Sequence, residues 1–155
     1  MAAGALAGLA AGCGASSPAA STQSVAAGGF RFAAPSGWSV QRSRLAVTAQ
    51  HGSELVQVST FPLTKPYRAA LYEKVGPELR GQLVRAAASV GGKVEDAGDV
   101  TAAGVRAHVY RVRVGDRVDE YTFVLVGRRE YQLLCRASEA GAEPCTQLQD
   151  TFELS

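Results

Sequence analysis

Apolar and polar residues alternate along the chain from residue 30 to residue 61. The alternation predicts a strand at 30–32, a second strand after the turn at 35–37, and a hairpin of strands 45–49 and 55–61 around a turn at 51–53. The two turns are Pro-Ser-Gly and His-Gly-Ser, which contain residues that favour turns. This part of the chain is therefore predicted to form β-structure.

The spacing of apolar residues changes after residue 65. Tyr67, Leu71, Val75, Leu79 and Leu83 recur every four residues, which predicts a helical segment over 65–90. Gly76-Pro77 interrupts this pattern, and proline suits the first turn of a helix. We therefore predict two helices in succession, the second ending at Gly91-Gly92.

Three β-rich runs follow, at 105–114, 118–126 and 130–137, separated by Gly-Asp and Gly-Arg dipeptides that suit hairpin turns. They predict an antiparallel meander. The middle run is apolar on both alternating faces, so we expect cover on both sides of the sheet. Leu148 and Phe152 predict a C-terminal helix over 145–154 as the second cover. The expected fold class is α+β, an α/β/α sandwich with a central, mainly antiparallel β-sheet.

This order of elements resembles the PsbP-like fold of many small bacterial lipoproteins. The resemblance covers residues 30–154 and is carried by FRFAAPSGW at 30–38, AAGVRAHVYRV at 102–112 and TFEL at 151–154. Members of this fold class include photosystem accessory subunits and cell-envelope lipoproteins without a known reaction. The resemblance thus implies a binding or assembly role, and it transfers no functional residue.

The N-terminal segment resembles a bacterial lipoprotein signal. Residues 2–12 are uncharged, apolar or small, and they end at Cys13. Ala11 and Gly12 suit cleavage before a lipid-modified cysteine, although Leu9 lies one place further upstream than the usual leucine, where Ala10 stands. We expect a signal segment at 1–12, lipid attachment to Cys13, a flexible tether at 13–29 and the PsbP-like domain at 30–155.

Two features of this segment qualify the expectation. The basic start of a secretory signal is missing, which predicts that the true start lies upstream of Met1. A disordered Ala/Gly leader with a chance cysteine is the alternative. The apolar run is shorter than the roughly 20 residues that a transmembrane helix needs.

The chain contains three cysteines, an odd number for an exported protein. Lipid on Cys13 would leave Cys135 and Cys145 as a pair, separated by nine residues. We expect a structural disulfide between them, with a redox-active pair as the alternative.

Composition and charge exclude some classes of protein. Hydrophobic residues make up 46% of the chain and charged residues 19%, as in a globular protein, and the net charge of +2 predicts no binding to nucleic acid. Seven arginines in the meander form a candidate surface for anionic headgroups or envelope polymers. Interleaved acidic residues would offset much of their charge, so a solvated face is the preferred interpretation. The arginines are Arg106, Arg111, Arg113, Arg117, Arg128, Arg129 and Arg136, and the acids are Asp116, Asp119, Glu120 and Glu130.

The sequence contains no recognisable catalytic, cofactor-binding or metal-binding motif. His51 and His108 lack partners at metal-ligand spacing, and Ser53 lacks the flanking residues of a nucleophile elbow. Trp38 is predicted to be a core residue rather than part of a ligand pocket.

We therefore expect a noncatalytic, monomeric cell-envelope lipoprotein. It would be anchored to the extracytoplasmic face of the cell membrane and would bind a protein or an envelope component. The alternatives are a carrier of a lipid or small apolar ligand, and an unrecognised hydrolase.

Overall fold

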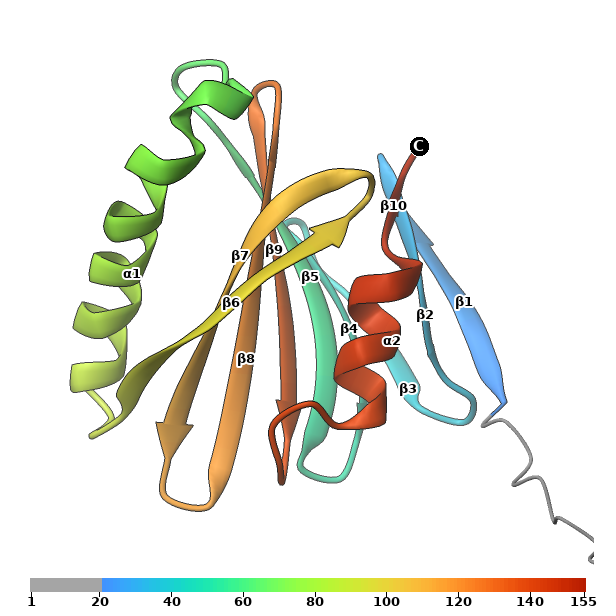
Figure 1. The fold of residues 1–155 in the computed structure, drawn as a ribbon. Coiled ribbons are helices and arrows are strands. Elements are labelled where there is room, and N and C mark those ends of the chain that lie inside the picture. The colour runs from blue at the N-terminus through green and yellow to red at the C-terminus, as the bar shows by residue number, and fades with distance from the viewer. Residues whose placement is uncertain (1–20) are drawn as a thin grey trace, which may run out of the picture.

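The computed structural model describes residues 21–155, which form two antiparallel sheets and two helices (Figure 1). The small sheet has the order β1 (Thr22–Ala27), β2 (Phe30–Pro35) and β10 (Glu153–Leu154). The large sheet has the order β3 (Ser39–Arg42), β4 (Ala46–His51), β5 (Glu54–Pro62), β9 (Arg129–Ala137), β8 (Arg117–Val126), β7 (Val105–Val114) and β6 (Lys93–Ala102). The helices are α1 (Tyr72–Ala88), preceded by the short 3-10 turn η1 (Ala69–Leu71), and α2 (Glu143–Thr151).

The large sheet lies between two covering layers (Figure 1). Helix α1 packs on one face beside β6 and β7, while α2 and the small sheet pack on the other face. Strand β8 contributes to both cores, with Val124 buried towards α2 and Phe123 buried towards α1. The expected α+β sandwich with a central antiparallel sheet is confirmed.

The three-stranded meander has the predicted order and nearly the predicted bounds. Strands β7, β8 and β9 pair antiparallel, and their turns contain Gly115 and Gly127, each with a positive φ that glycine adopts without strain. Successive residues of β8 point to opposite faces, and the register that the turns fix decides which residues face each core.

Helix α1 is one continuous helix, so the prediction of two successive helices is wrong. Pro77 lies inside it and removes a single backbone hydrogen bond. Leu79, Leu83 and Ala87 all pack into the second core, and the Tyr110 hydroxyl donates to the Gly76 carbonyl at 2.9 Å. This packing on both sides of the proline keeps the segment helical.

The predicted tether at 13–29 is wrong for residues 22–27, which form strand β1. The small side chains of this strand hide its role in the sequence, but Val25 is buried and the strand pairs along the whole of β2. The folded part therefore begins before the predicted residue 30. The expected signal segment at 1–12 and the attachment site Cys13 lie outside the described residues.

Two further elements differ from expectation. The predicted C-terminal helix ends at Thr151, and Glu153 and Leu154 instead pair with β2. Strand β6 was not predicted, because a bulge between Asp96 and Gly98 interrupts its alternation.

Trp38 is partly buried at the edge of the larger core. Neither described helix is long and apolar enough to span a bilayer.

Candidate functional site

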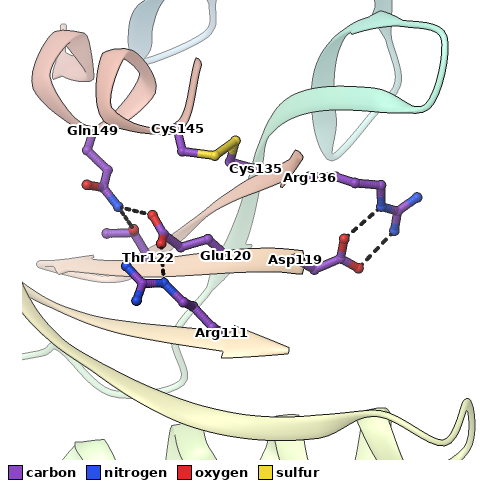
Figure 2. The surroundings of a disulfide bond; sticks show 8 residues. All are labelled: Arg111, Asp119, Glu120, Thr122, Cys135, Arg136, Cys145 and Gln149. Atoms are coloured by element: carbon purple, nitrogen blue, oxygen red, sulfur yellow. Dashed lines mark hydrogen bonds and ion pairs between the residues drawn. A yellow bond between two sulfur atoms is a disulfide. The ribbon is translucent and has the colours of Figure 1, made fainter. Parts of the chain in front are cut away.

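A disulfide connects Cys135 on β9 to Cys145 in the first turn of α2 (Figure 2). Their Cα atoms are 5.2 Å apart, and both residues are buried. The two cysteines that the sequence analysis pairs are therefore joined, and the bond ties α2 to the sheet.

Hydrogen bonds to Glu120 reinforce this attachment (Figure 2). Glu120 is buried, and it accepts a bond from Arg111 Nε at 2.8 Å and another from Gln149 Nε2 of α2 at 2.9 Å. Gln149 also donates to Thr122 Oγ1 at 2.9 Å. The buried carboxylate is thus paired, and these contacts fix α2 on the sheet.

Asp119, next to Glu120 in the chain, is buried on the opposite face of β8. Arg136 on β9 donates two hydrogen bonds to its carboxylate, at 2.7 and 3.0 Å (Figure 2). These bonds raise the pKa of the Arg136 guanidinium above its ordinary value. Arg136 therefore has a structural role.

The seven arginines of the meander do not form one surface. Arg111 and Arg113 lie on the α2 face of the sheet, whereas Arg106 and Arg136 lie on the α1 face, because adjacent residues in a strand point to opposite sides. Five of the seven have acidic partners, namely Arg106, Arg111, Arg113, Arg117 and Arg136. Asp119 and Glu120 provide part of this pairing, as expected.

The two histidines lie far apart in the fold. His51 is exposed next to the β4–β5 turn. His108 is packed under α1, where its ring stacks on Tyr72 with centroids 3.9 Å apart and its Nε2 lies 3.0 Å from the Tyr72 carbonyl oxygen. Gly76 provides the space, since a Cβ there would lie 2.9 Å from the ring.

A polar cluster that the sequence analysis did not identify lies beside His108. The Tyr72 hydroxyl donates to Asp99, and Arg106 donates to the same carboxylate at 3.1 and 2.5 Å. The Arg106 guanidinium carbon also lies 4.1 Å from the centroid of the Tyr72 ring. Asp99 lies on the unpredicted strand β6, so only the fold reveals its partners.

The contacts determine the protonation of this cluster. Burial, followed by the hydrogen bond to Asp99, raises the pKa of the Tyr72 hydroxyl well above its ordinary value. The bonds from Tyr72 and Arg106 lower the pKa of the Asp99 carboxyl. Tyr72 therefore stays protonated and Asp99 stays ionised near neutral pH, an arrangement that holds α1 to β6 and β7.

Two hollows lie at the end of the sheet that contains the β8–β9 turn. The first, of about 330 Å³, is lined largely by apolar groups, with Tyr67, Val105 and Leu125 among them and Arg106 at its wall. The second, of about 280 Å³, is lined by Phe30 and Val47 and by the basic residues Arg44 and Arg129. Apolar lining with a few polar groups is typical of binding sites. Among residues 21–155, no group of three or more His, Cys, Asp or Glu side chains is arranged to hold a metal ion.

Comparison with known proteins identifies the fold. No family model and no curated protein matches the chain. The solution structure of cyanobacterial PsbP (CyanoP) from Synechocystis sp. PCC 6803 matches 96% of this chain and 98% of its own, with a TM-score of 0.66 and 17% identity. A structure from Bacteroides thetaiotaomicron VPI-5482 matches 81% of this chain and 45% of its own at 11% identity, and its TM-score of 0.46 is too low to establish a shared fold.

The chain therefore has a PsbP-like fold. The predicted resemblance is confirmed at the level of architecture.

Proposed function

We propose that this protein is an extracytoplasmic binding module, anchored to the cell membrane by a lipid on Cys13 and acting without catalysis. The observation that carries the proposal is the buried Cys135–Cys145 disulfide. Stable disulfides are typical of exported proteins, and this one leaves Cys13 as the third thiol of the chain. Small residues before Cys13 support its use as a lipid attachment site.

The binding role is supported by the distribution of polar contacts. The buried charged side chains Asp119 and Glu120 are engaged in contacts that hold the fold. Hollows on the surface offer space for a partner: two lie at the end of the sheet that contains the β8–β9 turn, and another, of about 460 Å³, lies at the other end beside Glu54 and Asp116. Similarity of fold to cyanobacterial PsbP is consistent with this role. A protein or another envelope component is the proposed partner.

The experiment is affinity purification from membranes of the cells that make the protein. The full chain is compared with a Cys13→Ala variant, which changes none of the described residues 21–155. We expect the full chain to fractionate with membranes and to retain a reproducible partner, and the variant to leave the membrane fraction. Failure of both forms to retain any partner would contradict the binding role, whereas unchanged fractionation of the variant would contradict the anchor.

The hollow of about 330 Å³ favours a second candidate function, as a carrier of a lipid or small apolar ligand. Native mass spectrometry of the purified protein tests this function. A retained ligand that is lost when Leu125 is replaced by Arg would support it, and a ligand-free protein would contradict it.

A further inference from the structure

Five exposed basic residues lie on three loops at one end of the domain: Arg44, Lys65, Arg68, Arg128 and Arg129. None of them forms an ion pair with a residue in the range 21–155. Residues 1–20 contain no Asp or Glu that could pair with them. Their charge is therefore available to a partner. We call this region the basic end.

Backbone hydrogen bonds hold the three loops together. Thr60 N donates to Leu45 O at 2.8 Å, which joins the β3–β4 loop to the end of β5. Leu63 N donates to Arg128 O at 2.9 Å, and Tyr67 N donates to Gly127 O at 2.6 Å. The segment after β5 is thus fixed against the β8–β9 turn, so the loops that carry the basic residues lie together at this end, where Arg44 and Arg129 line the same hollow.

The opposite end of the sheet has four acidic residues without ion pairs, and we call it the acidic end. Arg117 and Arg136 also lie there, and both pair with Asp119. Glu54, Asp116, Glu139 and Glu143 lie in the β4–β5 turn, the β7–β8 turn and the segment around the start of α2, and none has an ion pair within the described residues. These turns lie at the far end of the strands from the β8–β9 turn (Figure 1). The ten residues of β8 separate the two ends by roughly 30 Å.

The chain enters the fold at the acidic end. Ser36 N donates to Ser21 O at 2.9 Å, and Ser39 pairs with Gln50 beside the β4–β5 turn. The eight residue steps from Cys13 to Ser21 span at most about 29 Å. A lipid on Cys13 would therefore attach the domain through its acidic end, and the basic end lies roughly 30 Å from this point of entry.

The basic end also presents apolar groups. Leu45 is 51% exposed next to Arg44, and the β8–β9 turn separates the two partly apolar hollows. A polyphosphate or a charged glycan has few apolar groups to fill these hollows. A protein segment with both acidic and apolar side chains matches both features of the surface.

We propose that the basic end, which lies opposite the point where the anchored chain enters the fold, is the docking surface for a segment of an envelope protein that carries acidic residues around apolar side chains. This inference rests on the proposed function as an anchored binding module, and it names the class of partner that the module binds. Arg44 and Arg129 pair with partner carboxylates, and Leu45 contributes an apolar contact.

The experiment is site-specific photocrosslinking in the cells that make the protein. A benzophenone amino acid replaces Leu45 at the basic end of the full chain or, as a matched position, Ser53 at the acidic end. We expect a crosslinked protein from position 45 and none from position 53, and the peptide joined to position 45 should be rich in Asp and Glu. Crosslinks to lipid or glycan, an equal crosslink from position 53, or no crosslink from position 45 would overturn the proposal.

Charge-reversal variants test whether the basic residues carry the interaction. The Arg44→Glu/Arg129→Glu variant should lower the crosslink yield roughly tenfold. The Arg85→Glu/Lys93→Glu variant makes the same change in charge elsewhere on the surface and should leave the yield unchanged. Equal yields from both variants would refute the proposal. Lipid on Cys13 is measured in the same cells, so failure of the anchor is distinguished from failure of the docking surface.

Discussion

The Cys135–Cys145 disulfide predicts a measurable contribution to stability. The bond closes a loop between residues ten apart in the sequence. The chain-entropy relation for a closed loop of this size gives about 3 kcal/mol at 25 °C. Replacing both cysteines by alanine should therefore lower the free energy of unfolding by about 2 to 3 kcal/mol.

The variant should still fold, because α2 is also held by other contacts. Leu148 and Phe152 are almost fully buried in the larger core, and Gln149 donates to Glu120 and Thr122. For a domain of about 135 residues with an unfolding entropy of about 2.1 cal/mol/K per residue, a loss of 3 kcal/mol lowers Tm by about 10 °C. The expected result is a less stable but cooperatively folded domain.

Urea denaturation and thermal circular dichroism measure both quantities. The comparison uses the full chain with Cys13→Ala, so that no third thiol can pair with Cys135 or Cys145. The Cys135→Ala/Cys145→Ala form is then compared with this background. A loss below about 0.5 kcal/mol would refute the role of the disulfide, and a fully unfolded variant would refute the stated role of the remaining α2 contacts.

Three further changes test the packing of both cores. Gly76→Ala should destabilise the domain by about 1–3 kcal/mol, because its Cβ would lie 2.9 Å from the His108 ring. Gly81→Ala in the same helix would contact only the end of the flexible Arg85 side chain and should be neutral or mildly stabilising. Equal effects of the two variants in urea denaturation would contradict this packing. The folded state lowers the pKa of Asp99, so its stabilising contribution is present above about pH 4 and is lost as the pH falls through the folded pKa. Asp99→Asn should therefore weaken the decrease in the free energy of unfolding at acidic pH. An unchanged decrease would contradict the cause given for the lowered pKa. Glu120→Gln should lower stability by about 1–3 kcal/mol because it removes the charge opposite the partly exposed Arg111, and a neutral effect would show that the Arg111–Glu120 pair does not stabilise the sheet.

The sequence predicts the elements that have strong local signals. The meander follows from regular alternation and from glycine at positions that need a positive φ. Strand β1 has no clear signal in the sequence, because most of its side chains are small and only Val25 is buried. The strand forms because it pairs with β2. Strand β6 was missed because the bulge at Asp96 breaks the pattern.

The candidate binding surface depends on contacts between distant segments. Seven arginines are close together in the sequence of the meander, but adjacent residues of a strand point to opposite faces, so Arg111 and Arg136 lie on opposite sides of the sheet. Arg44, Lys65 and Arg129 are distant in sequence, and the β-sheet brings their loops to one end. Charge counted along the chain could not identify this surface.

Intact-mass analysis of the protein purified from its own membrane tests the central claim most directly, namely that this is a lipid-anchored extracytoplasmic domain. The result expected is a mature chain that begins at Cys13 and carries a lipid there, with Cys135 and Cys145 oxidised to each other. An unmodified Cys13 together with free thiols at Cys135 and Cys145 would contradict the claim.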